Sequence, residues 1–190
     1  MGQLKGRLDS TQAALSIVAG AKMDTLTNGL DHQSIVRVMP NTPAQVGAGM
    51  TLWTCSEGVD NRAREMTKSV LGTIGQEIYV SDEKYMDMAT ALSASGPAYV
   101  FLFIEALIDA GVYVGMPRDM ARTLVLQTVF GSTKLVMDTG MHPAELKDMV
   151  VSPGGTTAEA LQVLEGEGVP AAIVSAVDAA YKKSVQLGQG

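Results

Sequence analysis

The chain is poor in the residues that build covalent cross-links and metal centres. Among its 190 residues there is one cysteine, Cys55, and there are two histidines, His32 and His142, which lie far apart. One cysteine excludes an intramolecular disulfide and a metal cage made of cysteines. The histidines stand in no ligand-like spacing, so we expect no metal site. A single cysteine and a polar start without a leader predict a reducing, cytoplasmic location.

Basic residues and long apolar runs are also scarce. Asp and Glu outnumber Lys and Arg by 20 to 14, which gives a formal net charge of −6. This balance argues against a nucleic-acid partner, because such proteins carry a basic patch. The longest apolar run, residues 98–104, is too short to cross a membrane and predicts a buried helix. There is also no G-x-G-x-x-G, P-loop, H-E-x-x-H or credible Ser/His/Asp set.

Up to residue 81, the chain alternates short apolar runs with helical patterns, and beyond it only helical patterns occur. Strands are predicted at 15–19, 35–39, 49–55 and 77–81, with helices at 24–30 and 60–74. Further helices are predicted at 83–93, 97–115, 119–138, 143–150, 157–166 and 170–187. Strands alternating with helices indicate a mainly parallel sheet. The fold class is therefore α/β followed by all-α, with domains at 1–81 and 82–190.

The helices at 97–115 and 119–138 are apolar on more than one face. A helix that is apolar all round is buried all round. A domain of this size has little room to bury so much surface, so we expect a partner subunit. A tightly packed monomeric core is the alternative.

The stretch VVSPGGTTAEALQVLE, residues 150–165, passes from glycines into a helix. Gly154 and Gly155 let the backbone turn its N–H groups inward, and the helix start adds partial positive charge. Such a turn suits a carboxylate without any Arg or Lys. Thr156 and Glu159 have the spacing of a capping box. An ordinary capped helix after a glycine turn is the competing interpretation.

Two other stretches have features of a ligand site. Pro97 interrupts a helical pattern and frees the carbonyl of Ser93, beside the hydroxyls of Ser93 and Ser95. The loop Met39-Pro40-Asn41-Thr42-Pro43 follows a buried strand, and the loop after Ala19-Gly20 should lie at the same edge. Ligands bind beyond the carboxyl ends of strands in open α/β sheets. A plain helix break and a proline-rich turn are the alternatives.

Taken together, VRVMPNTPAQVGAGMT, ALSASGPAYVFLFIEALIDAGVYVGMPRDMA and HPAELKDMVVSPGGTTAEALQVLE resemble pyrroline-5-carboxylate reductase, in order and in spacing. The resemblance covers roughly residues 15–186. It implies NADPH- or NADH-dependent reduction of 1-pyrroline-5-carboxylate to L-proline, the last step of proline biosynthesis. It also implies a Rossmann-type cofactor domain, and a helical domain that forms a homodimer or a higher oligomer.

The resemblance assigns roles to residues of all three stretches. Substrate carboxylate binding is implied for Ser152, Gly154, Gly155 and Thr156, and Thr157 is implied to hydrogen-bond the ring nitrogen and assist its protonation. The implied cofactor-binding residues are Ala19, Gly20, Met39, Asn41, Thr42 and Pro43. The kink that lines the site is formed by Ser93, Ser95, Gly96 and Pro97. Positioning matters more than a strong acid here, since a protonated imine is already electrophilic.

The family's opening β-α-β unit, with its glycine-rich fingerprint, has no counterpart in this sequence. We therefore expect a chain that is truncated within the Rossmann domain and binds NADPH weakly on its own. Two alternatives to a working reductase follow. One is a reductase inactivated by truncation, and the other is a non-catalytic remnant that only dimerises and binds ligand. A related dehydrogenase acting on another imine or keto substrate is a third reading, which the Ser-Pro-Gly-Gly-Thr-Thr loop opposes.

Overall fold

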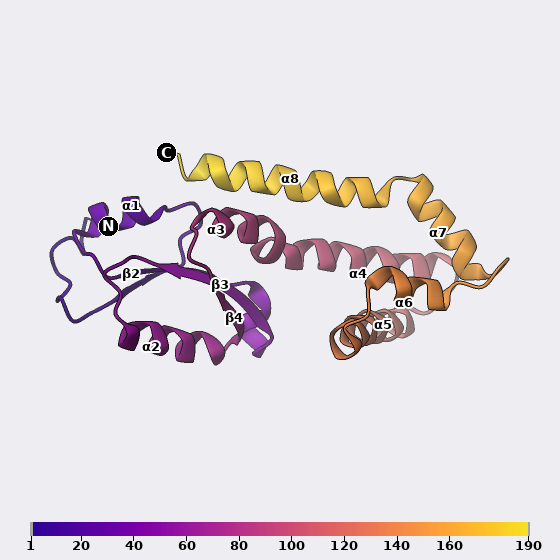
Figure 1. The fold of residues 1–190 in the computed structure, drawn as a ribbon. Helices are drawn as coiled ribbons and strands as arrows, with labels where there is room; N and C mark the ends of the chain where they lie inside the picture. Colours follow the sequence, from indigo (N-terminus) through magenta and orange to yellow (C-terminus); the bar gives the residue numbers. More distant parts are fainter. Residues whose placement is uncertain (1, 190) are drawn as a thin grey trace. The chain divides into compact units, whose positions relative to one another are not determined.

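A four-stranded sheet occupies the first part of the computed structural model, which describes residues 2–189. The strands β1 (Ala14–Ser16), β2 (Ile35–Met39), β3 (Gly49–Cys55) and β4 (Gly75–Tyr79) follow one another across the sheet. Figure 1 labels β2, β3 and β4. Strands β1 and β2 are parallel, as are β3 and β4, whereas β2 and β3 are antiparallel. The sheet is thus mixed and mostly parallel.

The antiparallel step between β2 and β3 was not predicted. These strands are joined only by a short 3-10 helix (Thr42–Val46) and its flanking residues, with no crossover helix. A parallel pair needs a crossover of a dozen or more residues, so this link returns the chain antiparallel. Two strand ranges were also misplaced. Strand β1 ends at Ser16 rather than residue 19, and β4 begins at Gly75, where its backbone closely approaches Gly49.

Helices pack on both faces of the sheet. On one face, α2 (Asn61–Gly72) covers a core cluster that includes Val36, Val38 and Trp53. On the other face, α1 (Met23–Leu30) packs with Ile35. Every residue of β2 is buried, which explains its nearly continuous run of β-branched residues.

The rest of the chain is helical. The helices are α3 (Lys84–Ala89), a π-helical turn (Thr90–Ala94), α4 (Gly96–Tyr113), α5 (Arg118–Thr139), α6 (Pro143–Val150), α7 (Thr156–Gly166) and α8 (Val169–Leu187). These bounds lie within about two residues of the predicted ones, apart from the helix predicted at 83–93. That helix is divided into α3 and the π-helical turn.

The chain divides into two compact units. The first, here called the sheet unit, combines the residues up to Pro97 with those from Ser175 onward. The second, the helical unit, is Ala98–Val174. The predicted domain boundary at 81/82 follows the change from strands to helices, whereas α4 and α8 each contribute residues to both units.

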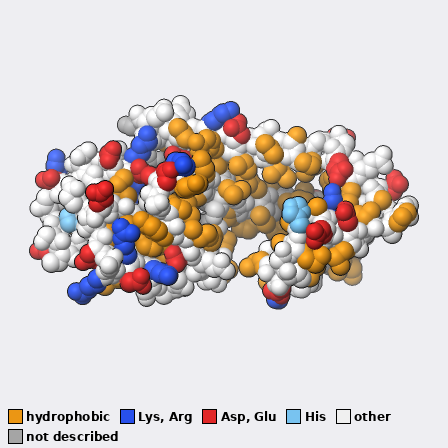
Figure 2. Space-filling view, viewed as in Figure 1, with side chains coloured by type: hydrophobic (Ala, Val, Ile, Leu, Met, Phe, Trp, Pro, Cys, Tyr) orange, Lys and Arg blue, Asp and Glu red, His pale blue; other side chains and the backbone are white. Residues whose placement is uncertain are grey.

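Large hydrophobic side chains remain exposed in the helical unit, and many hydrophobic side chains lie at the surface in Figure 2. An apolar hollow of about 260 Å³ is lined by α4 and α5 residues: Phe101, Ile104, Glu105, Ile108, Arg118 and Leu126. By length and composition the stretch Lys84–Tyr113 could cross a membrane, with 6% of its most apolar window buried in this chain. A helix packed against another subunit has the same composition, so this is weak evidence for a membrane span.

Candidate functional site

The loops after β1 and β2 form one part of the candidate site. Because these two strands are parallel, their carboxyl ends meet at the same edge of the sheet. Strand β1 is followed by residues 17–22, here called the 17–22 loop, and β2 is followed by Pro40 and Asn41. The structure therefore brings the two segments predicted for the cofactor to one edge, as expected.

Gly20 fixes the path of the 17–22 loop. It is buried and has a φ of +76°, a conformation that favours glycine. A Cβ at this position would lie 2.8 Å from the Cβ of Leu187, near the end of α8. Its neighbour Ala19 is exposed. The loop is thus packed against α8 at Gly20 and open to solvent at Ala19.

Asn41 joins the second loop to the helix kink. Its Oδ1 accepts a hydrogen bond from the backbone N–H of Met50 at 2.9 Å. Its Nδ2 donates to the carbonyl of Ser93 at 3.3 Å and reaches the Ser93 hydroxyl at 3.5 Å. The Ser93 carbonyl, which Pro97 was predicted to free, thus accepts a hydrogen bond from a side chain. Through these hydrogen bonds, Asn41 links the loop after β2 to the helix kink.

The kink itself is a π-helical turn. The backbone N–H of Ser95 donates to the carbonyl of Thr90, five residues earlier, at 2.9 Å. Such a turn inserts one extra residue into the helix, and π-turns occur frequently at functional sites. Ser95, Gly96 and Pro97 follow as half-buried residues. The kink and the Asn41 loop therefore lie together within the sheet unit.

The remaining predicted cofactor residues surround Asn41. Met39 is buried at the end of β2, and Thr42 and Pro43 open the 3-10 helix. Thr42 is exposed and Pro43 is half-buried. These positions leave Thr42 accessible from solvent, whereas Met39 contributes mainly to the core.

The Ser-Pro-Gly-Gly loop belongs to the helical unit. Gly154 has a φ of +68°, and the N–H of Gly155 donates to the carbonyl of Ser152 at 2.9 Å. A Cβ on Gly155 would lie 2.3 Å from the Ser152 hydroxyl oxygen, so a side chain there would displace it. Both glycines are therefore required by the shape of this turn.

This turn leaves several polar groups without partners. Helix α7 begins at Thr156, and the N–H groups of Thr156 and Thr157 have no acceptor among residues 2–189. The hydroxyls of Ser152, Thr156 and Thr157 likewise make no hydrogen bond within the described part of the chain. First-turn N–H groups and the helix dipole together favour an anion at this place. The loop can therefore bind a carboxylate through backbone groups and hydroxyls.

The predicted capping box is wrong. The N-cap residue of α7 is Gly155, and it makes no side-chain cap hydrogen bond. Thr156 lies one residue later, inside the first turn, where its hydroxyl cannot cap the helix. Because Thr156 does not cap α7, the backbone N–H groups at the start of this helix are available to a ligand.

The two histidines have structural roles. His32 Nε2 lies 2.7 Å from the carbonyl of Gln12, and His142 Nδ1 accepts from the N–H of Ala144 at 3.2 Å as the N-cap of α6. Among residues 2–189, no group of three or more His, Cys, Asp or Glu is placed to hold a metal ion.

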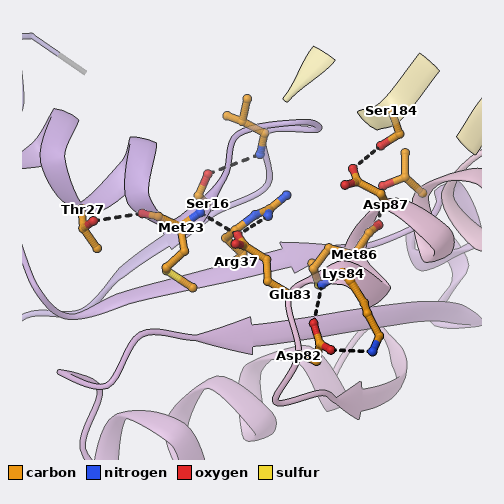
Figure 3. Close-up of polar contacts among 12 residues, drawn as sticks. Ser16, Met23, Thr27, Arg37, Asp82, Glu83, Lys84, Met86, Asp87 and Ser184 are labelled. Atoms are coloured by element: carbon orange, nitrogen blue, oxygen red, sulfur yellow. Dashed lines mark hydrogen bonds and ion pairs between the residues drawn. The ribbon is translucent and has the colours of Figure 1, made fainter. Parts of the chain in front are cut away.

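One contact near the site was missed by sequence reasoning. Arg37 lies inside β2 with its side chain 4% exposed, and it pairs with Glu83 (Figure 3). A signal was present, because an arginine within a run of β-branched residues needs a buried partner. The sequence does not say which acidic residue that partner is.

Comparisons with known proteins cover nearly the whole chain. The profile described as pyrroline-5-carboxylate reductase dimerisation matches residues 83–187. The pyrroline-5-carboxylate reductase of Synechocystis sp. is 46% identical over 175 residues, which are 92% of this chain and 65% of that protein. The Escherichia coli protein of the same name is 43% identical over 188 residues, 98% of this chain and 70% of its own length.

A solved structure agrees with these relatives. The crystal structure of Plasmodium falciparum pyrroline carboxylate reductase with NADP bound matches with a TM-score of 0.94 and 39% identity. The match covers 98% of this chain and 75% of that one. This chain therefore spans about two thirds of the length of the curated relatives it matches.

Proposed function

The chain belongs to the pyrroline-5-carboxylate reductase family, and from that premise we propose that it reduces 1-pyrroline-5-carboxylate to L-proline. The observation that carries the proposal is the Ser152–Thr157 turn. Its unpartnered N–H groups and hydroxyls are suited to a small carboxylate, and no lysine or arginine of the turn is needed. The homodimer and a cytoplasmic location are parts of the same proposal.

NADPH or NADH, when bound, supplies the hydride that is added to the C=N carbon of the substrate. The residues suited to hold the cofactor are those at the shared edge of β1 and β2: Ala19, Gly20, Met39, Asn41, Thr42 and Pro43. The proposed fit rests on the parallel pairing of these strands and on the exposure of Ala19. We assign residues 1–81 to the cofactor and residues 82–190 to substrate and dimerisation.

The chain's own residues position the substrate in this proposal. Ser152, Gly154, Gly155 and Thr156 hold the carboxylate at the start of α7. The Thr157 hydroxyl hydrogen-bonds the ring nitrogen, where a proton must reside for the C=N carbon to be electrophilic. The kink at Ser93, Ser95, Gly96 and Pro97 lines the site, with Asn41 holding it in place.

The homodimer is supported by the exposed apolar surface of α4 and α5 and by the dimerisation profile over residues 83–187. Assembly beyond a dimer is compatible with the same surface. No nucleic-acid or membrane partner forms part of the proposal.

The test is 1-pyrroline-5-carboxylate-dependent oxidation of NADPH, followed by absorbance, on the purified chain. Thr157→Ala should lower kcat by about 10- to 100-fold, the range expected when a positioned proton-transfer or hydrogen-bonding group is lost. Thr73→Ala is the matched control, since Thr73 is an exposed threonine at the end of α2. Equal rates for the two variants would contradict the role of Thr157.

A folded dimer that binds L-proline without turnover would overturn the reductase proposal for this chain. That result would support the non-catalytic alternative, a module that dimerises and binds ligand.

A further inference from the structure

Arg37 presents a charge that the fold must neutralise. It lies in the middle of β2, where all five residues are buried, on the same face as Ile35, which packs against α1. Its only ion-pair partner among the described residues is Glu83, whose side chain is 36% exposed. A buried charge is tolerated only when it is paired. The buried Arg37 side chain therefore holds the Glu83 carboxylate in place.

The same oxygen of Glu83 makes a second contact. Its Oε1 accepts a hydrogen bond from the backbone N–H of Met23 at 2.6 Å. Met23 is the first residue of α1, and the N-cap residue of that helix, Lys22, provides no side-chain cap. Glu83 therefore caps α1 from 60 residues away, and its negative charge also favours a helix N-terminus.

Helix α1 begins where the 17–22 loop ends. Within this loop the hydrogen bonds are few and long: Ala21 N–H to the Val18 carbonyl and Val18 N–H to the Ser16 hydroxyl, each 3.4 Å. The position of the loop is therefore set by the packing of Gly20 against the end of α8 and by the two ends of the loop. One end continues from β1, and the other is fixed by the Met23–Glu83 bond (Figure 3).

One turn further along α3, Asp87 makes a related contact. Its Oδ1 accepts from the Ser184 hydroxyl of α8 at 2.6 Å. The end of α8 packs directly against Gly20, through Leu187 and Gly188. Glu83 and Asp87 thus connect α3 to both sides of the 17–22 loop, through α1 and through α8.

Helix α3 also leads to the other cofactor segment. It continues into the π-helical turn, where Ser93 contacts Asn41. Residues 83–94 therefore contact Met23, which directly follows the 17–22 loop, near their start and Asn41 near their end.

We propose that Glu83 is a positioning residue for the cofactor: paired with Arg37, it fixes the start of α1 and with it the 17–22 loop. This inference rests on the proposed function. Glu83 makes no hydrogen bond to Ala19 or Gly20, the residues of this loop proposed to bind the cofactor, and acts through Met23. Loss of its contact should weaken cofactor binding while leaving the Ser152–Thr157 turn, and therefore substrate binding, nearly unchanged.

The first experiment compares Glu83→Gln with Asp82→Asn. Glutamine keeps an acceptor but loses the charge that pairs with Arg37, and Asp82 is an exposed neighbour whose partner is Lys84. Glu83→Gln should raise the KM for NADPH about tenfold, as expected for loss of a charge-assisted contact. Its KM for the imine should change less than about twofold, within the error of such comparisons. Asp82→Asn should leave both values unchanged.

A second pair of variants removes the buried charge, in case Glu83→Gln does not fold. Arg37→Met/Glu83→Gln and Arg37→Met/Glu83→Ala both lack an unpaired arginine, and replacing a buried pair is often tolerated. They differ only in whether the side chain of residue 83 can accept a hydrogen bond from the backbone N–H of Met23. The alanine variant should show the higher KM for NADPH and faster amide exchange at residues 18–23.

The outcomes separate this inference from the proposed function. If the wild-type chain turns over and residue 83 has no effect on the KM for NADPH, the inference is wrong and the function stands. If the chain binds NADPH, measured by its fluorescence, in a residue-83-dependent way without turnover, the inference stands and the reductase proposal falls. A chain that binds no NADPH contradicts both.

Discussion

In the sheet unit, Ile35, Val38 and Trp53 are all at most 3% exposed within a single chain. Residues 98–174 are all described, and among them Ala121 alone is buried. The helical unit nevertheless contains the more apolar helices, with side chains such as Phe101 and Leu102 more than half exposed. The contrast indicates that the sheet unit has a core of its own, whereas the helical unit leaves apolar surface exposed that the proposed second copy would bury.

The site residues divide in the same way. The segments proposed to bind the cofactor belong to the unit that holds its own core, and the Ser152–Thr157 turn belongs to the unit that does not. A change in the sheet core should therefore act on one chain, whereas a change on α4 or α5 should act on the assembly.

The largest effect should come from a charge on the helical unit. Phe101→Glu places a carboxylate in the hollow lined by α4 and α5, where burial against a second copy would remove it from water. We expect the dimer dissociation constant to rise by about 30-fold or more, the loss typical of an interface hot spot. Sedimentation equilibrium measures it.

The control for this variant is Val46→Glu. Val46 is 81% exposed in the sheet unit, so the same new charge lies away from the proposed interface. Equal dissociation constants for the two variants would show that α4 and α5 do not form the dimer surface.

The next largest effect should come from the core of the sheet unit. Ile35 is 0% exposed, and Ile35→Ala should destabilise the sheet unit by about 3 kcal/mol through lost burial and a cavity. Urea unfolding followed by the fluorescence of Trp53, the single tryptophan, measures the change. Because the sheet core is complete in one chain, its loss of stability should be independent of protein concentration. A concentration-dependent shift would contradict the comparison.

A local effect is expected in the Ser-Pro-Gly-Gly turn. Gly155→Ala brings a Cβ against the Ser152 hydroxyl, which must move, so affinity for L-proline should fall about tenfold through lost carboxylate contacts. Gly166→Ala, at the end of the same helix with open space around it, is the control. Calorimetric titration with L-proline compares them. An unchanged affinity in Gly155→Ala would argue that the carboxylate binds elsewhere.

The smallest effect should come from an exposed ion pair. Hydrogen bonds from the Lys84 ammonium, and then from its backbone N–H, hold the pKa of Asp82 below its ordinary value of 3.8. The stabilisation is therefore present at neutral pH and lost as the pH falls through this lowered value. Because both side chains are exposed and screened by solvent, this stabilisation is too small to shift the urea midpoint, and Asp82→Asn at neutral pH should unfold at the same urea concentration as wild type. An NMR titration should show the pKa of Asp82 return toward 3.8 in Lys84→Gln.

The sequence anticipated most elements of both units, because their hydrophobic periods and Gly and Pro breaks are local signals. Residues 35–39, 49–55 and 143–150 were predicted with the bounds that the structure has. The antiparallel pairing of β2 and β3 was missed, since pairing direction depends on a connection and not on either strand's composition. The residue composition of the kink likewise predicted an interruption at Pro97 without specifying a π-helical turn.

Prediction of the site depended on the same distinction between local signals and contacts distant in sequence. The turn at Gly154 and Gly155 was visible because glycines at a helix start have a local meaning. The bonds of Asn41 to Met50 and Ser93, and of Glu83 to Arg37 and Met23, join residues distant in sequence. The residues near position 83 do not indicate that Glu83, rather than Asp82, contacts Arg37 and Met23. That choice follows from the packing of α3 against the sheet.

The most direct test of the comparison is amide hydrogen exchange at two protein concentrations, one well above and one well below the dimer dissociation constant. Burial by a second copy should make protection in α4 and α5 increase with concentration, while protection in β2 and β3 stays the same. Protection in α4 and α5 that is high and identical at both concentrations would contradict the account, because the helical unit would then be stable as a single copy.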